Sequence, residues 1–400
     1  MLKDKTILLG VSGGIAVYKA VELLRLLVKA GATVHVVMTR NAGEFVTPLT
    51  FQTLSGHPVH TELFNLYQER EIGHISLADR ADLVILAPAT ANLVGKLANG
   101  LADDLLTTTV MATRAPVLLV PAMNTNMYEN PLYQRNEQRL VDAGYQLLSP
   151  VSGDLACGWV GTGKMPEPQA ILDKAVEVLT VKDLTGCRIL VTAGPTCEEI
   201  DPVRYLTNRS SGKMGYAIAD AARRRGAEVI LVSGPSRLAA PAGVTFVPVT
   251  TAEQMHAAVT TRFSRVDLVI KAAAVADYRP RVRYGQKMKK QGEKCTLELE
   301  PTTDILAELG RQKTHQILVG FAAETEKLLE HAARKLQQKN LDLIVANDVS
   351  GPDTGFDTDE NIVQFLSPDG SREALPQMSK EAVAGALLDR VRSLWLAKQR

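Results

Sequence analysis

The sequence predicts an α/β protein with two doubly wound, mostly parallel-sheet domains that follow one another along the chain. Near-continuous apolar runs of strand length alternate with stretches long enough for helices, which is typical of parallel sheets covered on both faces. This alternation begins at Thr6 and begins again at Cys187, and a glycine-containing turn follows the first strand each time. Ligands of such sheets bind beyond the carboxyl ends of the strands, so the loops after the strands are the candidate functional segments.

The first domain opens with a strand at Thr6–Val11, the tight turn Ser12-Gly13-Gly14 and a helix at 15–29. Further buried strands are predicted at 33–39, 83–88 and 117–121. Polar residues follow the last two of these strands, in the segments 90–92 and 124–126. The glycine turn is not a GxGxxG dinucleotide motif, and construction of the fold explains such a turn more often than cofactor binding does.

Two further residues of the first domain are candidates for chemistry. His74 lies just before a predicted helix, where a lone histidine is usually solvated or caps the helix. Cys157 lies in a glycine-rich segment, residues 154–165, with the composition of a mobile flap over a site. A lone cysteine is more often inert, but one on such a loop is placed to meet a substrate.

A domain boundary is predicted after the helix at 169–180, where the chain becomes polar. We expect a first domain at residues 1–182, a linker at 183–186 and a second domain at 187–400. The second domain repeats the alternation of strands and helices. Its strands are predicted at 187–193, 228–233, 245–249, 267–274, 316–321 and 341–346.

The loop after the first strand of the second domain is rich in Arg, Lys, Asn and Ser and leads into a helix predicted at 214–225. Backbone N–H groups at a helix N-terminus, aided by such side chains, suit a phosphate or a carboxylate. The alternative is a polar crossover loop that ends in an ordinary serine N-cap. Lys213 does not belong to a P-loop, because Thr207 stands where that motif needs glycine and Met214 where it needs Ser or Thr.

A long basic segment at 279–294 interrupts the alternation and is predicted to be an extended arm. It carries the sequence Lys-Met-Lys-Lys at 287–290, which by itself is either a solvated face or a triphosphate contact. Lys335 and Lys339 are four residues apart on a helix predicted at 324–340, so they share a face.

Composition excludes several classes of protein. The formal net charge is +1, so the protein as a whole has no electrostatic field that would attract nucleic acid or a membrane surface. The four cysteines are widely spaced and form no metal-binding pattern, as in a reduced cytoplasmic protein. We see no signal-peptide pattern and no apolar run of membrane-spanning length, and we expect a soluble, cytoplasmic enzyme.

Taken together, the loops resemble those of two enzyme families. The first domain resembles homo-oligomeric flavin-containing cysteine decarboxylases through GHISLADRADLVILAPATAN, PAMNTNMY and LACGWVGTGKMPEP. The second resembles phosphopantothenate-cysteine ligases through AGPTCEEIDPVRYLTNRSSGKMG, AAAVADYRP, KMKK, VGFAAET and LDLIVANDVS. The resemblance covers nearly the whole chain and implies a bacterial bifunctional enzyme of coenzyme A synthesis, with a flavodoxin-like domain followed by a Rossmann-like ligase domain.

For the first domain, the resemblance implies an FMN-dependent decarboxylation of 4'-phosphopantothenoylcysteine. The flavin is needed because direct loss of CO2 would leave a carbanion with no adjacent electron sink, whereas oxidation of the CH2–SH group gives a thioaldehyde that accepts the electrons. In the family pattern His74 assists the oxidation, Asn124 holds the substrate carboxylate and Cys157 donates a proton late in the cycle. The expected flavin contacts are Ser12, Gly13, Gly14, Thr39, Thr90, Ala91 and Asn92.

For the second domain, the resemblance implies that CTP and Mg2+ activate 4'-phosphopantothenate as an acyl-cytidylate, from which the amine of L-cysteine displaces CMP. Lys287 matches the lysine of the nucleotidyl step, and Asn208 the residue that holds the acyl intermediate. The metal ligands are not assigned. The expected nucleotide contacts, besides Lys287, are Ala272, Ala273, Asp277, Thr302, Thr303, Asp304, Ile305, Phe321, Lys335 and Lys339.

The resemblance also implies a homo-oligomer, with trimers of the flavin domain, paired ligase domains and a dodecamer as the full assembly. Two alternatives remain open at this point. One is a flavin-binding regulatory subunit, which binds a partner without turnover; the complete ligase half argues against it. The other is a decarboxylase of a different peptidyl-cysteine, which the first-domain motifs alone do not exclude.

Overall fold

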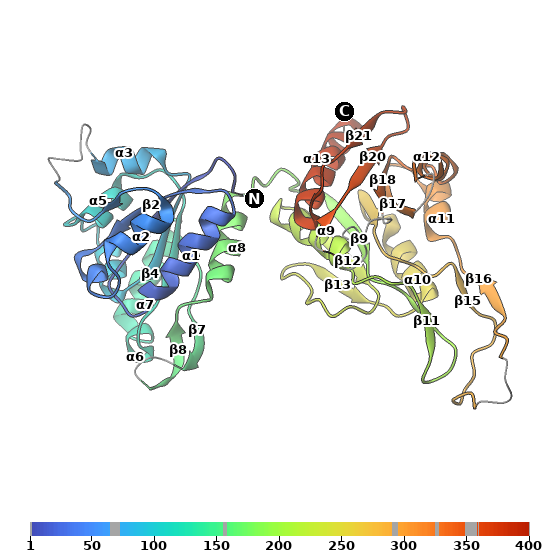
Figure 1. Ribbon diagram of the computed structural model, residues 1–400, viewed down its shortest axis with the longest axis horizontal. Helices are drawn as coiled ribbons and strands as arrows, with labels where there is room; N and C mark the ends of the chain where they lie inside the picture. The colour runs from blue at the N-terminus through green and yellow to red at the C-terminus, as the bar shows by residue number, and fades with distance from the viewer. Residues whose placement is uncertain are drawn as a thin grey trace. The chain divides into compact units, whose positions relative to one another are not determined.

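The computed structural model describes residues 2–64, 73–154, 158–289, 295–324, 328–348, 358 and 360–399. The chain divides into two compact units, Met1–Thr180 (unit 1) and Val181–Arg400 (unit 2), and each is described by itself (Figure 1). Both are α/β units built on a largely parallel sheet, which confirms the predicted fold class.

Unit 1 contains a six-stranded sheet in the order β3-β2-β1-β4-β5-β6, and every neighbouring pair within the described residues is parallel. This order differs from the 2-1-3-4-5 order of flavodoxin, so the likeness to flavodoxin lies in the doubly wound layers alone. The order was not predictable because strand pairing depends on long-range contacts and not on local pattern. The strands are β1 (Thr6–Val11), β2 (Thr33–Met38), β3 (Val59–His60), β4 (Leu83–Ala89), β5 (Val117–Pro121) and β6 (Gln146–Leu147).

Helices cover both faces of this sheet. One core joins the sheet to α1, α2 and α8, and a second core joins it to α3, α4, α5 and α7. Because both faces are covered, β4 is buried along its whole length, which explains its unbroken apolar sequence. The helices are α1 (Val17–Lys29), α2 (Pro48–Ser55), α3 (Gly73–Arg80), α4 (Ala91–Ala98), α5 (Leu105–Ala112), α6 (Thr125–Tyr128), α7 (Pro131–Asp142) and α8 (Pro168–Leu179), with a 3-10 turn at Arg40–Glu44.

Unit 2 contains an eight-stranded sheet in the order β13-β12-β9-β14-β17-β18-β20-β21. The strands from β13 to β18 are parallel, and the last two pairings are antiparallel. Because the order reverses beside β9, the crevice between the ends of β9 and β14 is the place where such a sheet binds ligands. The strands are β9 (Arg188–Ala193), β12 (Glu228–Ser233), β13 (Thr245–Pro248), β14 (Leu268–Lys271), β17 (Ile317–Glu324), β18 (Leu343–Asp348), β20 (Val363–Leu366) and β21 (Arg372–Ala374).

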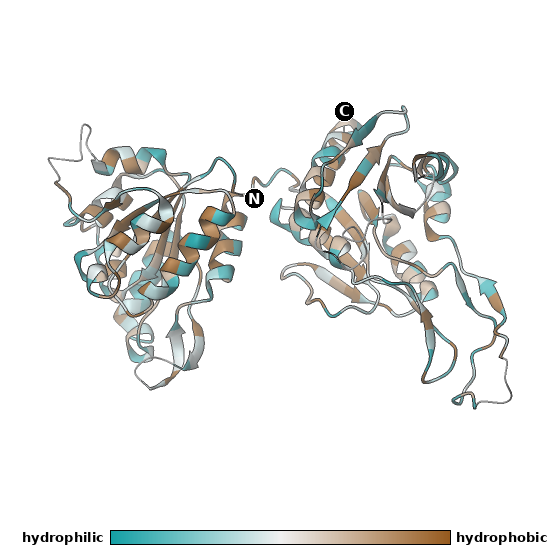
Figure 2. Cartoon of the chain, in the orientation of Figure 1, coloured by the Kyte–Doolittle hydropathy of each residue, from teal (hydrophilic) through white to brown (hydrophobic). Residues whose placement is uncertain are grey.

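The helices of unit 2 also pack in two layers. Helices α9 and α13 share a core with one face of the sheet, and α10, α11 and α12 share a core with the other. In Figure 2 the helices carry brown and teal stretches side by side, as expected for helices with one buried face. The helices are α9 (Lys213–Arg224), α10 (Ala252–Phe263), α11 (Ile305–Gln312), α12 (Leu328–Gln338) and α13 (Lys380–Lys398).

Short two-stranded ribbons extend from both units. In unit 1, β7 (Val151–Asp154) and β8 (Val160–Lys164) form an antiparallel hairpin. In unit 2 the ribbons pair β10 (Cys197–Glu199) with β11 (Tyr205–Thr207), β15 (Tyr278–Pro280) with β16 (Leu299–Pro301), and β19 (Glu360–Asn361) with β22 (Met378–Ser379).

The segment predicted to be a linker, residues 183–186, packs onto unit 2. The Leu184 side chain is fully buried in the core that α9 and α13 share, and its N–H donates to the carbonyl of Arg225. Asp183 forms a 2.8 Å ion pair with Arg225. These contacts place the segment in unit 2, which begins at Val181. Within the described residues, no helix is both long enough and apolar enough to span a membrane.

Candidate active sites

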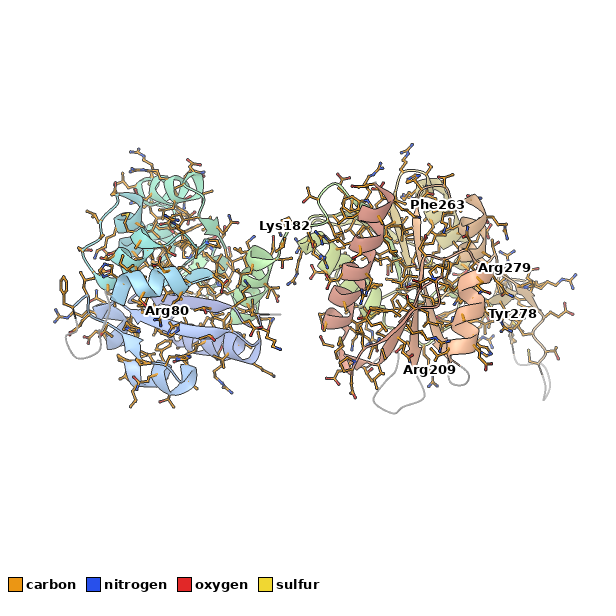
Figure 3. All side chains as sticks on the ribbon, turned by 90° about the horizontal axis from the view of Figure 1, so that it is seen from above. Arg80, Lys182, Arg209, Phe263, Tyr278 and Arg279 are labelled. Carbon is orange, nitrogen blue, oxygen red and sulfur yellow. The ribbon has the colours of Figure 1, made fainter. Side chains whose placement is uncertain are left out.

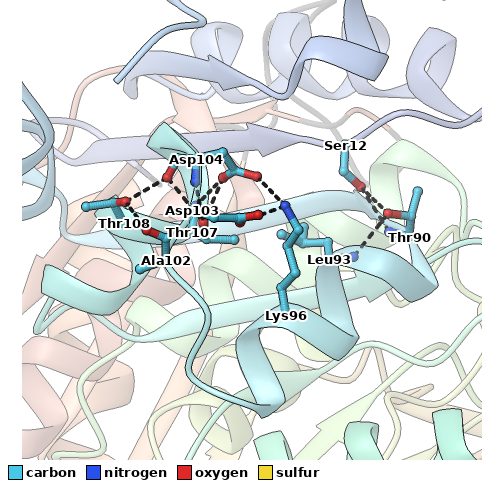
Figure 4. A network of polar contacts seen from close by, with 9 residues as sticks. All are labelled: Ser12, Thr90, Leu93, Lys96, Ala102, Asp103, Asp104, Thr107 and Thr108. Carbon is cyan, nitrogen blue, oxygen red and sulfur yellow. Dashed lines mark hydrogen bonds and ion pairs between the residues drawn. The ribbon is translucent and has the colours of Figure 1, made fainter. Parts of the chain in front are cut away.

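Ser12 and Thr90 join the ends of two neighbouring strands in unit 1. The Ser12 hydroxyl donates to the Pro88 carbonyl at 2.8 Å and accepts from the Thr90 N–H at 3.0 Å. The Thr90 hydroxyl in turn accepts from the Leu93 N–H and caps α4 (Figure 4). These bonds fix the crevice between β1 and β4, where a doubly wound sheet binds its ligand.

The last turn of α4 is fixed as well. Lys96 forms ion pairs with Asp103 at 2.7 Å and with Asp104 at 3.0 Å. Asp104 caps α5 through a reciprocal pair of bonds with Thr107, as Figure 4 shows. Consequently α4 is held at both ends, and its first N–H groups, at Ala91 and Asn92, are rigidly placed at the crevice.

The glycine turn leaves room for a ligand. A Cβ atom added at Gly13 would lie 2.5 Å from the Asn41 side chain, so the backbone there must be glycine. A Cβ atom added at Gly14 would meet only the Thr90 methyl group, at 3.6 Å. The space above Gly14 is therefore open, and a ligand can approach the backbone closely.

A pocket of about 370 Å³ opens at this crevice. It contains the predicted residues Gly13, Gly14, Thr90, Ala91 and Asn124. The other lining residues are mostly apolar, which suits a planar aromatic ring; they are Ile15, Ala16, Tyr18, Lys19, Ala122, Met123, Met127, Asp154, Gly163, Lys164 and Met165.

Four predicted residues do not line this pocket. Ser12 is buried beneath it, Asn92 lies on α4, and His74 lies half-buried on α3. The Thr39 hydroxyl oxygen is buried and has no hydrogen-bond partner among the described residues. Such an oxygen is costly unless a ligand supplies the missing bond, so Thr39 fits a flavin contact. Cys157 lies outside the described residues.

Asn124 lies directly after β5 and caps α6, because its Oδ1 accepts from the Asn126 N–H at 2.9 Å. A carboxylate accepts hydrogen bonds, so the amide nitrogen is the Asn124 atom that would bind it. The hairpin strand β8 packs on this loop: a Cβ atom at Gly163 would lie 2.2 Å from the Met123 carbonyl oxygen. The glycines of the predicted flap are thus needed for its close packing on the Asn124 loop.

Lys19 is a pocket residue that the sequence analysis missed. Its ammonium group is almost buried, donates to the Met165 carbonyl at 3.1 Å and pairs with Glu167 at 2.8 Å. It therefore ties α1 to the end of the β7–β8 hairpin. The available signal was a lysine within the otherwise apolar face of α1.

A second pocket, of about 380 Å³, lies at the carboxyl ends of β9, β14, β17 and β18 in unit 2. Eleven predicted residues line it: Asn208, Ala272, Ala273, Asp277, Thr302, Thr303, Asp304, Ile305, Phe321, Lys335 and Lys339. The sequence analysis missed Lys213, Lys271, Asn347, Asn361 and Lys380, which also line it. The lysines Lys213, Lys271, Lys335, Lys339 and Lys380 outnumber the carboxylates Asp277 and Asp304, so the pocket suits an anion.

Polar contacts order the side of this pocket formed by α11 and α12. Asp304 caps α11 by accepting from the Ala307 N–H at 3.0 Å, and it pairs with Lys339 at 2.7 Å. Although burial favours its neutral form, these contacts keep the pKa of Asp304 below its ordinary value. Lys335 donates to the Phe321 carbonyl at 2.8 Å. Both predicted lysines of α12 are therefore held toward the strand ends.

Asn208 lies across the pocket on the loop after β11. Its amide nitrogen donates to the carbonyl oxygens of Ala274, at 3.2 Å, and Val275, at 3.1 Å. Its oxygen is therefore the end that can accept a hydrogen bond from an incoming amine. The helix that follows, α9, begins at Lys213. Its N-cap is Gly212, with a φ of 84° and no side-chain cap, so the alternative of an ordinary serine N-cap is wrong.

Lys287 does not line the pocket. It is exposed on the basic arm. The arm leaves unit 2 through the ribbon β15–β16, which begins at Tyr278 and Arg279, both labelled in Figure 3. The arm is anchored at the following residue, Met288: its N–H donates to Asp201 at 3.1 Å and its carbonyl accepts from Arg204 at 2.6 Å. Lys290 lies outside the described residues.

Two family models match consecutive parts of the chain. The model described as "Flavoprotein" matches residues 1–180, and the model described as "DNA/pantothenate metabolism flavoprotein C-terminal domain" matches residues 184–394. These two ranges coincide closely with the two compact units of the structure.

Curated relatives match over the full chain. The coenzyme A biosynthesis bifunctional protein CoaBC of Bacillus subtilis is 52% identical over 398 residues, which is 98% of this chain and 98% of the relative. The protein of the same name from Escherichia coli K12 is 47% identical over 404 residues, covering 100% of this chain and 99% of the relative.

Solved structures match one unit at a time. The C-terminal domain of a coenzyme A biosynthesis bifunctional protein CoaBC is 48% identical and covers 53% of this chain and 97% of that one, with a TM-score of 0.47. The FMN binding protein AtHal3 is 32% identical and covers 43% of this chain and 95% of that one, with a TM-score of 0.38.

Proposed function

The chain belongs to the family of bifunctional coenzyme A biosynthesis proteins, a decarboxylase joined to a ligase, and from this premise we propose how its two pockets divide the work. Unit 2 joins L-cysteine to 4'-phosphopantothenate with CTP. Unit 1 decarboxylates the product, 4'-phosphopantothenoylcysteine, to 4'-phosphopantetheine with bound FMN. The observation that carries this division is the contrast between a lysine-rich pocket in unit 2 and a largely apolar pocket in unit 1.

The flavin site we propose in unit 1 uses Gly13, Gly14, Thr39 and the start of α4. The open space above Gly14 admits the cofactor. The Thr39 hydroxyl, which has no partner among the described residues, can form a hydrogen bond to the flavin. The rigidly held N–H groups of Ala91 and Asn92 suit its phosphate. Bound FMN would supply the two-electron oxidation of the cysteine side chain that makes loss of CO2 feasible.

The substrate carboxylate is assigned to the amide nitrogen of Asn124. This residue lines the pocket on a loop packed closely against β8, so it can hold the carboxylate at a fixed place until CO2 leaves. His74 is assigned to accept the proton released in the oxidation, and Cys157 to return a proton after CO2 has left. Both of these roles come from the family pattern.

The ligase reaction in unit 2 runs in two displacements. A carboxylate oxygen of 4'-phosphopantothenate attacks the α-phosphorus of CTP, and the bond to the β-phosphate oxygen breaks to release pyrophosphate. The cysteine amine then attacks the acyl carbon, loses a proton and displaces CMP. The pocket lysines hold the phosphates, and Lys287 balances the charge that develops on the α-phosphate. The Asn208 oxygen accepts a hydrogen bond from the attacking amine.

Magnesium is proposed to enter with the nucleotide. The described residues contain no cluster of three or more His, Cys, Asp or Glu side chains that would hold a metal ion alone. Mg2+ usually binds one or two carboxylates together with substrate phosphates and water, so it does not need such a cluster. The pocket carboxylates Asp277 and Asp304 are compatible with such a mixed set.

We also propose that the protein works as a cytoplasmic homo-oligomer with trimeric flavin units and paired ligase units. The exposed apolar side chain of Leu49, with 68% of its surface accessible, is available for a subunit contact in unit 1. Light scattering on the purified protein measures the assembly, and a monodisperse monomer contradicts it.

The experiment that tests the proposed function supplies the purified protein with 4'-phosphopantothenate, L-cysteine, CTP and Mg2+. We expect 4'-phosphopantetheine by mass spectrometry, together with stoichiometric CO2, pyrophosphate and CMP. Replacing CTP by ATP measures the nucleotide preference. A yellow protein that releases no CO2 from 4'-phosphopantothenoylcysteine would instead support a flavin-binding regulatory subunit.

A further inference from the structure

Lys271 occupies an unusual place for a lysine. It is the last residue of β14, the strand between β9 and β17, and it pairs in register with Thr192 on one side and Gly320 on the other. The three preceding residues of β14 are fully buried. Lys271 itself is half-buried, so its ammonium group keeps only part of its hydration, which costs free energy unless another group compensates.

The groups around Lys271 leave its charge uncompensated. The charged side chains that act on it are Asp304 before α11, Lys335 and Lys339 on α12, and Asp277 after β14. Asp304 is already paired with Lys339, at 2.7 Å. Within the described part of the chain, the structure records no hydrogen bond or ion pair for the Lys271 ammonium, although the residue lines the pocket.

The environment disfavours the charged form of this lysine. Burial is the main cause, and the positive charges of Lys335 and Lys339 add to it. The negative charges of Asp304 and Asp277 favour the ammonium form, but they do not offset the other two effects. Together they lower the pKa of Lys271 to about 8. The amine therefore changes its charge in the range where the enzyme can be assayed.

We propose that Lys271 is a further phosphate-binding residue of the unit 2 pocket, and that nucleotide binding is coupled to proton uptake by its amine. The inference rests on the proposed CTP site and extends it to a residue that the family motifs do not include. The open pocket beside the ammonium and the excess of lysines around it favour an anionic ligand, and the phosphate chain is the anionic part of the nucleotide.

The physical consequence is a link between affinity and pH. A phosphate oxygen beside Lys271 favours the ammonium form and raises its pKa in the complex. The last ionisation of a phosphate lies near pH 6, so above pH 7.5 the nucleotide itself takes up almost no proton. At pH 8 binding should therefore bring in about half a proton, and affinity should fall by about tenfold between pH 7 and pH 9.

The test is titration calorimetry of the full-length protein with CTP and Mg2+ at pH 8, in two buffers of different ionisation enthalpy. The wild type should take up about half a proton per site, and Lys271→Met should take up none and bind CTP with an affinity that is flat from pH 7 to pH 9. Methionine keeps the length and flexibility of the chain without the charge. Lys182→Met is the matched control, because Lys182 lies at the far end of α9 from the pocket and donates to the Arg224 carbonyl.

Two further ligands identify the group that Lys271 binds. Inorganic pyrophosphate should give the wild type about half a proton more uptake than Lys271→Met, a difference in which the ligand's own ionisation cancels, and cytidine should give no such difference. Uptake with cytidine alone, or equal uptake by wild type and Lys271→Met, overturns the proposal while leaving the CTP site intact. Absence of any CTP binding by the wild type overturns the proposed nucleotide site and the role of Lys271 with it.

The pH dependence of the stability of the ligand-free protein distinguishes a folded Lys271→Met variant from a misfolded one. Because the pKa of Lys271 is lower in the folded than in the unfolded chain, the wild type should gain stability as pH rises from about 8 toward 10. Lys271→Met should lose this gain and be no less stable than the wild type at pH 7, because it no longer buries a charge. A cooperative melting curve with the wild-type pH dependence would contradict the assignment.

Discussion

Thr39, Asn347 and Asn361 each bury a side-chain oxygen that has no hydrogen-bond partner within the described part of the protein. Asn347 and Asn361 line the unit 2 pocket. Buried oxygens of this kind are rare in folded proteins because water satisfies them in the unfolded chain. Thr39 follows β2, and the two asparagines line a pocket, so we expect ligands to supply the missing hydrogen bonds.

Replacing Thr39 by valine tests this for the flavin. The change keeps the shape and removes the hydroxyl, so the flavin-free protein should be as stable as the wild type or more stable, by up to about 1 kcal/mol. Flavin affinity should fall by roughly fivefold, which corresponds to the loss of one neutral hydrogen bond. Fluorescence titration with FMN measures the affinity. Loss of stability without loss of flavin affinity would assign Thr39 to the fold instead.

Replacing Lys287 by glutamine tests the nucleotidyl step. Removing this point charge should slow release of pyrophosphate from CTP by roughly 100-fold, and decarboxylation of added 4'-phosphopantothenoylcysteine should not change. Arg281→Gln is the control, since Arg281 is an exposed basic residue of the same arm that pairs with Glu298. An undiminished nucleotidyl rate in Lys287→Gln would exclude the assigned role.

The basic arm shows how an element far from the sheet is held in place. Asp201 is almost completely buried, and its carboxylate accepts from the N–H groups of Val203, Arg204 and Met288 and from the Arg204 guanidinium. Desolvation by itself would raise the pKa of Asp201, but these hydrogen bonds keep it well below its usual range. Because the folded-state pKa is depressed, the stabilisation is present above the ordinary pKa of an aspartate, near 4, and is lost only in stronger acid.

Replacing Asp201 by alanine should therefore free the arm at neutral pH. We expect faster tryptic cleavage after Lys287 and Lys289 and a nucleotidyl rate lower by roughly 10- to 100-fold, because Lys287 is no longer positioned. Decarboxylation should not change. Asp220→Ala is the control, since Asp220 also pairs with arginines in unit 2 but lies on α9. Unchanged cleavage together with a slow nucleotidyl step would show that Asp201 does not act through the arm.

At the same scale, local pattern predicted the main elements and missed the ones that depend on distant partners. The strand Glu228–Ser233 was predicted to the residue, because its apolar run is bounded by turn signals on both sides. The ribbon β19–β22 has two residues per strand, and only pairing across the fold defines it. Spacing along α12 predicted that Lys335 and Lys339 share a face. It could not find Lys271, which in the sequence only ends an apolar strand.

The two units have separate apolar cores, and the junction between them belongs to the second unit. Each unit has apolar layers on both faces of its own sheet, so each buries a core of its own. The sequence placed the change of domain within a polar stretch. It could not show that Leu184 is fully buried in unit 2, whereas Val181 and Lys182 are exposed. Polarity alone does not distinguish a free linker from a segment that pairs its charges.

Limited proteolysis tests this division. Trypsin should cut after Lys182, an exposed residue labelled in Figure 3. Val181 and Lys182 are both exposed, and although the Lys182 ammonium donates to the Arg224 carbonyl, they come before the buried Leu184. Each fragment should melt cooperatively, and each should keep its own half of the reaction. Leu184→Ala should lower the stability of the C-terminal fragment by about 2 to 4 kcal/mol and leave the N-terminal fragment unaffected, because it opens a cavity in one core only. Early cleavage inside β1 to β5, or equal destabilisation of both fragments, would mean that the two sheets do not fold independently.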